Sequence, residues 1–328
     1  MKICIVKLSA MGDIIHAMVA LQFIKEHFVD SQIDWIVESG FKGVLENNPH
    51  IDNILPVNLK SIKNKKSEIF NQIKLVREYS KNNYDIVIDA QGLIKSAIVA
   101  KVVGAKVIAG FDKESTREGI ASLFYKIGVK IAYDENTIDR NVRVICEPLG
   151  IKVTSDDILA KKSFLYFGDK YKNNLVQDYN LIVIGSTWDS RNYPKEKFVE
   201  VVDKLKILTY IVWGSQAEYE KALWMQEQSQ YLEVLPKGNL NVLKGVIANC
   251  KLLIGNDTGP THMAWGLNIP SITIFGPTPI NRVYITPINR VIKSNSVVDH
   301  YKLDKNDYSI NEIEVDAIVK IAEELLRV

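Results

Sequence analysis

The segment Cys250–Thr278, CKLLIGNDTGPTHMAWGLNIPSITIFGPT, decides the fold. Its two apolar runs, Lys251–Ile254 and Ser271–Phe275, have the composition of buried strands. The residues between them, from Pro260 to Leu267, predict a helix. A strand, a short loop, a helix and a second strand form the repeating unit of a parallel α/β sheet.

The loop between the first strand and the helix carries the polar residues of this segment. Asp257 and Thr258 stand at the expected N-cap of the helix, and Gly259 permits a tight turn close to a ligand. His262 is expected in the first helical turn, facing the same crevice. Since ligands of open α/β sheets bind at the carboxyl ends of the strands, and helix N-termini bind phosphates, the loop predicts an anion site.

The same alternation of strand and helix extends through the whole chain. We expect helices over residues 120–127 and 142–149, among others. A polar break at residues 167–174 predicts a linker between domains 1–168 and 169–311, followed by an amphipathic helix at 312–328. The chain is therefore expected to form two doubly wound α/β domains facing across a cleft. The expected strands lie at 2–6, 33–37, 54–57, 84–89, 106–110, 181–184, 210–213, 233–235, 251–254, 271–275 and 290–292.

The composition is that of a soluble globular protein with no overall preference for nucleic acid. The 328 residues are 47% hydrophobic and 24% charged, with a net charge of only +2. The scattered residues Cys4, Cys146 and Cys250 favour buried thiols in a reducing compartment over zinc or disulfides. The first apolar run is too short for a signal peptide, and none approaches the roughly 20 residues of a membrane span. We therefore expect a cytoplasmic protein, which could still dock on a membrane surface.

The sequence predicts no metal site. His16, His27, His50 and His300 lack metal-ligand spacing, and we assign them structural roles. Neither an HExxH nor a DxD pattern occurs in a suitable context.

Ser9–Asp13, which reads SAMGD, follows the first strand. Gly12 permits close approach of the backbone, and Asp13 can act as the cap of the next helix. A carboxylate at the carboxyl end of a strand is equally well placed as a general base. The spacing alone does not decide between the two roles.

Two loops of the second half have polar residues at corresponding positions. Ser186–Arg191 offers hydroxyl groups and a cation suited to phosphate oxygens, although a solvated loop explains it as well. Glu218 follows another strand, where an acidic residue can hold ribose hydroxyls or simply occupy the first turn of a helix.

The first half has a basic loop with Lys60, Lys63, Lys65 and Lys66, which Arg117 could join. Such a run is usually a solvated face. Together these cations would suit an acceptor that bears phosphates or carboxylates. Nucleic acid fits less well, because no aromatic residues are interleaved with the lysines.

These motifs together resemble the ADP-heptose:lipopolysaccharide heptosyltransferases. The matching segments are VKLSAMGDIIHAMVAL, DWIVESGF, DIVIDAQGLIKSA, ESTREGIASLFY, WGSQAE, LPKGNL and GNDTGPTHMAWGL, which span nearly the whole chain in order. ESTRE and the basic loop favour the heptosyltransferase I group over its second-heptose relatives.

The resemblance implies a GT-B fold, in which the final helix packs back on the first domain. It also implies a metal-independent, inverting transfer of L-glycero-D-manno-heptose from its ADP donor. The acceptor would be the inner Kdo (3-deoxy-D-manno-octulosonic acid) of Kdo2–lipid A at the cytoplasmic face of the inner membrane. The enzyme would be peripheral there and monomeric, without a nucleic-acid partner.

The resemblance also assigns roles to individual positions. Asp13 matches the general base. Acceptor-binding positions are Ser9, Gly12, Lys60, Lys63 and Arg117. Donor-binding positions are Ser186, Thr187, Arg191, Glu218, Gly238, Asp257, Thr258, Gly259 and His262.

The chain departs from the family pattern at a few positions. Arg191 stands where a lysine is familiar, which keeps the charge but changes the geometry. Gly238 could contact adenosine only through its backbone, and Trp188 and Pro260 are unusual beside the motifs.

The expected mechanism is a single in-line displacement. Asp13 deprotonates a Kdo hydroxyl, while Arg191 and the N–H groups after Asp257 stabilise the departing ADP phosphates. Asp257 itself is expected to bind heptose hydroxyls, and Glu218 the ribose. Alternatives are another GT-B enzyme, such as a later-acting heptosyltransferase or a nucleotide-sugar epimerase, and a non-catalytic nucleotide-sugar-binding paralogue.

Overall fold

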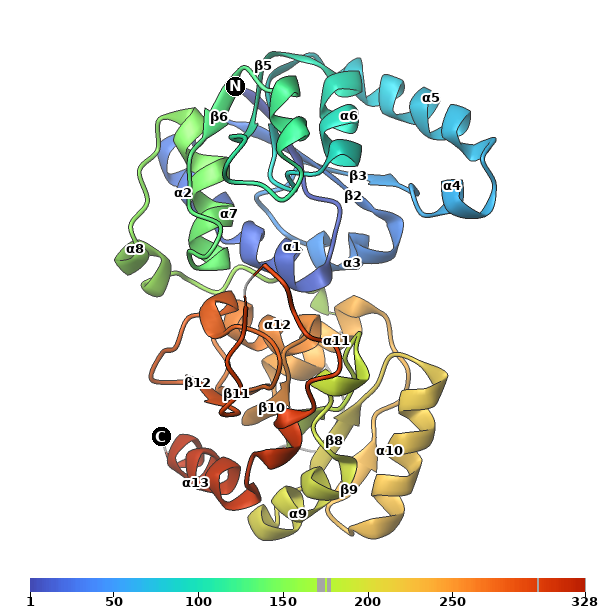
Figure 1. Cartoon of the computed structure of the whole chain (residues 1–328), viewed down its shortest axis with the longest axis vertical. Helices are drawn as coiled ribbons and strands as arrows, with labels where there is room; N and C mark the ends of the chain where they lie inside the picture. The colour runs from blue at the N-terminus through green and yellow to red at the C-terminus, as the bar shows by residue number, and fades with distance from the viewer. Residues whose placement is uncertain (170–174, 176–177, 300, 328) are drawn as a thin grey trace. The chain divides into compact units, whose positions relative to one another are not determined.

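The computed structural model describes residues 1–169, 175, 178–299 and 301–327, and leaves the side chains at 63 and 64 undescribed. The chain forms two compact units, Met1–Tyr166 and Phe167–Val328, each built on its own sheet (Figure 1). The division falls close to the expected boundary after residue 168. One histidine assigned a structural role, His300, lies outside the described residues.

The first unit is a six-stranded parallel sheet in the order β3-β2-β1-β4-β5-β6. Its central strands are continuous apolar runs because helices cover both faces of a parallel sheet. The strands are β1 (Lys2–Val6), β2 (Gln32–Glu38), β3 (Asn53–Val57), β4 (Tyr84–Asp89), β5 (Ala105–Phe111) and β6 (Ile127–Val129). The helices are α1 (Met11–Met18), α2 (Ala20–His27), η1 (Ser39–Phe41), α3 (Lys42–Leu45), α4 (Ser61–Asn64), α5 (Glu68–Ser80), α6 (Ile94–Val103), η2 (Gly119–Phe124), α7 (Thr137–Cys146), η3 (Glu147–Leu149) and α8 (Ser155–Leu159).

The second unit is also a six-stranded parallel sheet, in the order β12-β11-β10-β7-β8-β9. Its strands are β7 (Asn180–Val183), β8 (Thr209–Val212), β9 (Leu232–Val234), β10 (Leu252–Asn256), β11 (Ser271–Phe275) and β12 (Asn289–Lys293). Its helices are η5 (Asp189–Arg191), α9 (Lys195–Leu205), α10 (Gln216–Gln228), α11 (Leu240–Ala248), α12 (Gly259–Leu267), η6 (Ile280–Arg282), η7 (Ser309–Glu312) and α13 (Val315–Leu326).

The two sheets have the same topology. In each, the first strand along the chain pairs with both the second and the fourth, so the strand order reverses there. The reversal lies between β1 and β4 in the first unit and between β7 and β10 in the second. Such switch points are where doubly wound sheets bind ligands, at the carboxyl ends of the strands. The expected pair of doubly wound α/β domains is confirmed.

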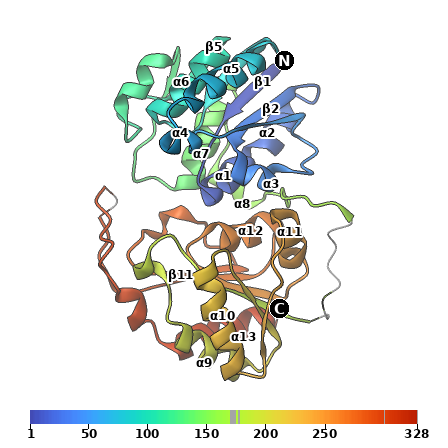
Figure 2. The same cartoon turned by 90° about the vertical axis from the view of Figure 1, so that its right-hand side faces the viewer.

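The final helix differs from its expected packing. The buried face of α13, which includes Ile318 and Ala322, belongs to the core of the second unit. There α13 packs against α9 and the β10–β11 side of the sheet, and the helices lie side by side in Figures 1 and 2. The prediction that this helix packs back on the first domain is therefore wrong for its apolar face. An amphipathic pattern shows that a face is buried, but not against which domain.

A second difference concerns the segment after Arg117. A helix was expected over residues 120–127, but the chain forms the 3₁₀ helix η2 and then the edge strand β6. Ile120 and Leu123 are 63% and 81% exposed, so the apolar spacing does not mark a buried helical face.

The three cysteines are free and buried, as expected. Within the described part of the chain, no helix has the length and apolar character needed to cross a membrane.

Candidate functional site

Most of the predicted donor-binding residues come together in the second unit, after β7 and after β10. These strands are neighbours in the sheet, with Gly255 paired to Val183, so the loops that follow them emerge side by side. The residues Ser186, Thr187 and Arg191 follow β7, and Asp257, Thr258, Gly259 and His262 follow β10. The position is the switch point of the sheet.

Asp257 is the centre of this group. Its side chain is almost fully buried, and each carboxylate oxygen accepts hydrogen bonds from the protein. Arg191 Nη2 lies 2.7 Å from Oδ2 and also donates to the backbone carbonyl of Asp257. His262 Nε2 lies 3.1 Å from Oδ1, and Thr278 Oγ1 donates to Oδ2 at 3.0 Å. The carboxylate therefore fixes the guanidinium, the imidazole and the loop after β11 relative to one another.

The surroundings of Asp257 keep its carboxylate ionised. Burial alone would raise its pKa, but the hydrogen bond with His262 and the charges of Arg191 and Arg282 outweigh burial, and its pKa lies well below the ordinary value. The group is thus a permanent anion that orients cations. Thr278 and Arg282 were missed in the sequence, because nothing in the run from Gly276 to Arg282 marks them as partners of Asp257.

Asn256 and Gly255, at the end of β10, hold the loop after this strand in position. The buried amide of Asn256 accepts from the Tyr193 backbone N–H at 3.0 Å and donates to the Ile184 carbonyl at 3.0 Å. This ties the end of β10 to the end of β7. A Cβ on Gly255 would lie 2.6 Å from Thr261 Oγ1, so only glycine allows α12 to pack this closely.

The N-terminus of α12 is open. Thr258, not Asp257, is the N-cap, and its side chain makes no capping hydrogen bond. Its Oγ1 is buried without a hydrogen-bond partner among the described residues. Gly259 begins the helix directly after the bend at Asp257 and Thr258, so the chain turns tightly from β10 into α12, and it does so without a positive φ at the glycine. The first-turn N–H groups of a helix lack intrahelical acceptors, so this end can bind an anion.

The loop after β7 places Arg191 beside Trp188. The guanidinium carbon lies 5.5 Å from the centre of the Trp188 ring, and Lys305 Nζ lies 5.0 Å from it. Ser186 Oγ hydrogen-bonds to the backbone of Trp188 at 3.3–3.4 Å, while Thr187 is exposed. The tryptophan thus supports the arginine by a cation–π contact.

Glu218 lies against the same strand end. Its carboxylate accepts from the Gly214 N–H at 2.7 Å, and a Cβ on Gly185 would lie 2.2 Å from the Glu218 carboxyl carbon. Gly185 is therefore required for the glutamate to approach the end of β7. The backbone N–H of Glu218 donates a capping hydrogen bond to Ser215 Oγ at 3.3 Å.

Gly238 stands just before the N-cap of α11. A Cβ there would lie 2.7 Å from Val242, so a side chain fits only if Val242 moves. The absence of a side chain at Gly238, which departs from the family pattern, is therefore consistent with the close approach of Val242.

Asp13 lies in the first turn of the helix that follows β1 in the first unit. It is the third residue of α1, and its carboxylate accepts from the Ala10 backbone N–H at 3.2 Å. Asp13 is thus a capping partner and not the N-cap, which is Ala10. It is partly exposed, as is Gly12, so the carboxylate can meet a ligand.

Gln91 holds the loop before Asp13, a role that no sequence pattern predicts. Its Oε1 accepts from the backbone N–H groups of Leu8 and Ser9 at 3.1 and 3.0 Å. Gln91 follows β4, which pairs with β1 at the switch point of the first sheet. The two loops are therefore locked together by one side chain.

Lys7 was also missed, because a lysine at a strand end is usually solvated. Here it is buried and donates from Nζ to the Ala90 carbonyl at 2.8 Å. Burial lowers its pKa, and the carboxylates of Asp13 and Asp89 oppose that shift. Asp89 is itself buried, and burial raises its pKa. Hydrogen bonds from Tyr125 and Ser96 lower the pKa, but by less than burial raises it.

The predicted acceptor cations are placed only in part. Lys60 is exposed at the start of α4, with Nζ 5.1 Å from the Phe41 ring centre. Arg117 is exposed in the loop before η2. The side chain of Lys63 lies outside the described part of the structure.

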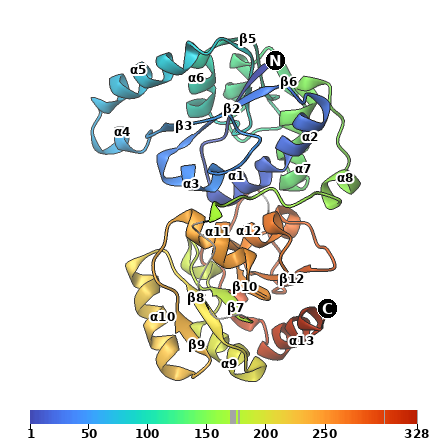
Figure 3. The ribbon, with the colours of Figure 1, turned by 180° about the vertical axis from the view of Figure 1, so that it is seen from behind.

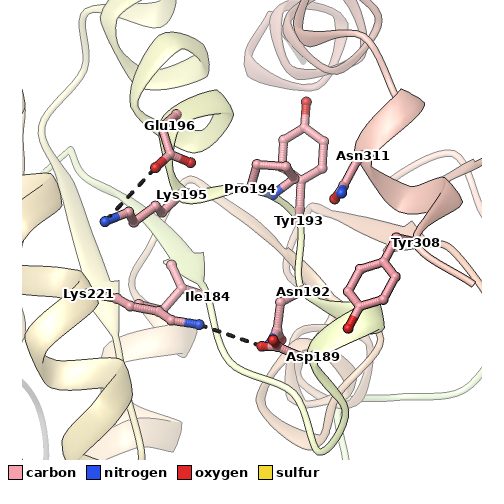
Figure 4. A pocket seen from close by; sticks show the side chains of 10 residues that line it. All are labelled: Ile184, Asp189, Asn192, Tyr193, Pro194, Lys195, Glu196, Lys221, Tyr308 and Asn311. Atoms are coloured by element: carbon pink, nitrogen blue, oxygen red, sulfur yellow. Dashed lines mark hydrogen bonds and ion pairs between the residues drawn. The ribbon is translucent and has the colours of Figure 1, made fainter. Parts of the chain in front are cut away.

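A pocket of about 280 Å³ opens beside η5 in the second unit (Figure 4). None of the predicted donor residues lines it. Its charged side chains pair with one another, Lys221 with Asp189 at 3.8 Å and Lys195 with Glu196 at 3.9 Å. It is therefore separate from the cluster around Asp257.

Over the described residues, no three His, Cys, Asp or Glu side chains are grouped so that they could hold a metal ion. The positive groups around Asp257 are Arg191, Arg282 and the N-terminal end of α12.

Known proteins match this chain over nearly its full length. The profile of glycosyltransferase family 9 (heptosyltransferase) matches residues 72–312. Lipopolysaccharide heptosyltransferase 1 of Campylobacter coli is 37% identical, covering 99% of each chain. The protein of that name from Escherichia coli K12 is 32% identical over 85% of this chain and 88% of its own. The solved structure of E. coli heptosyltransferase WaaC with ADP-2-deoxy-2-fluoro heptose has a TM-score of 0.82, at 27% identity and 99% coverage of both chains.

Proposed function

This chain belongs to glycosyltransferase family 9, the heptosyltransferases, and we propose from that premise that it transfers heptose from ADP-L-glycero-D-manno-heptose to Kdo2–lipid A. The reaction is a step of lipopolysaccharide core biosynthesis. The observation that carries the proposal is the cluster of Arg191, Asp257 and His262 at the open N-terminus of α12, at the switch point of the second sheet.

The second unit is proposed to bind the donor. The N-terminal N–H groups of α12 and the Arg191 guanidinium suit the pyrophosphate. Glu218, next to Gly185, suits the ribose hydroxyls, and the backbone at Gly238 the adenosine. WaaC binds an ADP-heptose analogue, as the name of its structure states, which supports this choice of donor.

Asp257 is proposed mainly to orient other side chains, and only secondarily to bind the sugar. Three protein donors already bind its carboxylate. A carboxylate has about four acceptor positions, so a heptose hydroxyl can occupy what remains. Its first task is to hold Arg191 and His262 in place.

The first unit is proposed to bind the acceptor. Asp13 removes the proton from a Kdo hydroxyl as that oxygen attacks the anomeric carbon of heptose. The new C–O bond forms as the bond to the ADP phosphate breaks, and the configuration inverts. Arg191 and α12 stabilise the negative charge that develops on ADP, which is the charge a metal ion would otherwise neutralise.

The Ser9–Gly12 backbone and the cations Lys60, Lys63 and Arg117 are proposed to bind the acidic groups of the acceptor. Because the acceptor is a lipid, the enzyme is proposed to act as a peripheral protein at the cytoplasmic face of the inner membrane. The resemblance to the heptosyltransferases further supports a monomer that works without a metal.

A transfer assay tests the proposal. Purified protein and ADP-heptose are incubated with Kdo2–lipid A or with the already heptosylated lipid, and products are identified by mass spectrometry. We expect one heptose on Kdo2–lipid A and little on the heptosylated lipid. The reverse preference would indicate a later-acting heptosyltransferase, and consumption of donor without acceptor would indicate an epimerase.

A further inference from the structure

Helix α5 has an apolar side with little cover. Of its 13 residues only Val76 is buried, although Ile69, Ile73 and Val76 share one face. Ile69 is 42% exposed and Phe70 is 75% exposed. Helices α5 and α4 lie at the outer side of the first unit, beyond α6 (Figures 1 and 3).

A groove runs between α5, α6 and the loop that leads into α4. It has a volume of about 480 Å³ and a lining that is almost entirely apolar. The residues that form it include Leu59, Ile62, Ile69, Ile73, Ile98 and Val102.

Every charged residue that lines this groove is a lysine. Lys66 and Lys95 are exposed, and neither forms an ion pair within the described residues. Glu68, on α5, is already paired with Lys65 at 3.8 Å. Leu59 lines one end of the groove, and the next residue, Lys60, is exposed.

We propose that this face, defined as the α5–α6 groove with Phe70 and the rim lysines Lys66 and Lys95, is the surface by which the protein docks on an anionic lipid bilayer. Apolar side chains enter the interface while lysines contact the lipid phosphates. The inference rests on the proposed function only in that it takes the partner to be a membrane.

A bilayer fits this face better than a single acyl chain does. An acyl chain could fill the groove but would leave Phe70 exposed. Leu123 on η2, which packs against α6, is also 81% exposed. A lipid leaflet covers the groove and these projecting side chains together. A second copy of the chain is a poorer partner. It would bring the unpaired rim lysines of two subunits together, and their like charges would repel.

Vesicle binding by the full chain tests the proposal. We expect it to co-sediment with phosphatidylcholine vesicles that contain phosphatidylglycerol, and far less with phosphatidylcholine alone. Lys66→Gln with Lys95→Gln should lower the partition coefficient about fivefold for each lysine. Ile69→Ser with Phe70→Ser should lower it about tenfold or more. These side chains are exposed, so folding should be spared.

Matched controls change exposed residues of the same unit away from the groove. Val29→Ser, at a position 74% exposed, and Lys152→Gln with Lys162→Gln should leave vesicle binding within about twofold. Binding that the controls weaken as much as the groove variants would overturn the inference. So would equal binding to neutral vesicles, saturation by a monomeric short-chain phospholipid, or a dimer that Phe70→Ser dissociates.

Transfer to a water-soluble, deacylated Kdo acceptor separates this inference from the proposed function. The Ile69→Ser with Phe70→Ser variant should transfer heptose to it at the wild-type rate. A wild-type protein that turns over this acceptor but ignores anionic vesicles would refute the docking surface alone. Groove-dependent vesicle binding without any heptose transfer would refute the proposed function alone.

Discussion

Asp13 makes a capping hydrogen bond and is also placed to act as a base, and one pair of substitutions separates these roles. Asp13→Asn keeps an oxygen that can accept from the Ala10 N–H, whereas Asp13→Ala does not. General-base catalysis typically contributes about 10²–10⁴-fold. We therefore expect both variants to lose at least about 100-fold in kcat, while only Asp13→Ala loses stability, by about 0.5–1 kcal/mol. Steady-state transfer kinetics and urea denaturation measure the two effects.

The Asp13→Asn variant distinguishes capping from general-base catalysis. If Asp13→Asn transfers heptose at a rate near that of the wild type, capping is the whole role of Asp13 and another group must remove the proton.

The depressed pKa of Asp257 predicts how the free energy of unfolding depends on pH. Its folded pKa is depressed, while an unfolded aspartate titrates near about 3.9. Below that pH the unfolded chain binds a proton that the folded carboxylate does not, so the contribution of Asp257 is complete above about pH 4 and is lost as the pH falls. Asp257→Asn should cost about 3 kcal/mol at pH 7, because it leaves the largely buried Arg191 without its counter-ion.

The difference between wild type and Asp257→Asn should therefore shrink as denaturation is measured at successively lower pH. A difference that stays constant from neutral to acid pH would show that the carboxylate is not held ionised by its partners.

The basic loop before and within α4 is proposed to bind the acceptor and not the donor. Lys60 and Arg117 are both exposed, so replacing them should disturb little of the fold. For Lys60→Ala with Arg117→Ala we expect the KM for Kdo2–lipid A to rise about 10-fold or more, as each charge-assisted bond contributes about 1.5–3 kcal/mol. The affinity for ADP, measured by calorimetry, should not change. Weakened ADP binding would move these residues to the donor side.

Helix α13 should stabilise the second unit. Ile318 is fully buried in that core, and a cavity there typically costs about 2–5 kcal/mol. Four of the five tryptophans, Trp188, Trp213, Trp224 and Trp265, lie in this unit, so fluorescence reports mainly its unfolding. Ile318→Ala should lower the urea midpoint by this probe, whereas Lys320→Ala, at an exposed position, should not. Equal midpoints for Ile318→Ala and the wild type would place the stabilising contacts of α13 elsewhere.

Elements with continuous apolar runs could be predicted from the sequence. Tyr84–Asp89 and Ser271–Phe275 are strands with the expected bounds, because parallel strands are buried on both faces. The short edge strand β6 could not be predicted, since three residues with one buried side chain have no periodicity. The partner of α13 could not be predicted either, because amphipathicity does not identify the surface that covers it.

Site residues could be predicted from the sequence where their position in the loop after a strand is enough to place them. Asp13, Arg191 and Asp257 follow strands, and the alternation of strands and helices brings such positions to one edge of a sheet. Gln91, Lys7 and Thr278 act through partners that are distant in the sequence, at 83 residues for Lys7 and Ala90 and 21 for Thr278 and Asp257. Their polar atoms have several conventional uses, and only the folded sheet selects one.

At the scale of the whole molecule, two sheets of the same topology offer two switch points, and the proposed function assigns the donor to only one of them. A ligand that binds the native state stabilises it by about 2.7 kcal/mol at a concentration of 100 Kd. We expect ADP to slow hydrogen exchange mainly in the second unit, in peptides that cover the end of β10, the start of α12 and the loop after β7. Peptides that cover Lys7–Asp13 and Asp89–Leu93, at the other switch point, should exchange as in the free protein.

Mass spectrometry of peptides from one exchange reaction measures both switch points in the same sample, so the first unit is an internal control for the second. Adenosine, which lacks the pyrophosphate, should protect the α12 peptide much less than ADP does, because the open helix end is proposed to bind phosphate. Protection by ADP that is confined to Lys7–Asp13 and Asp89–Leu93 would exchange the roles of the two units. Equal protection of α12 by adenosine and ADP would keep the donor in the second unit but remove the helix N-terminus as its phosphate site.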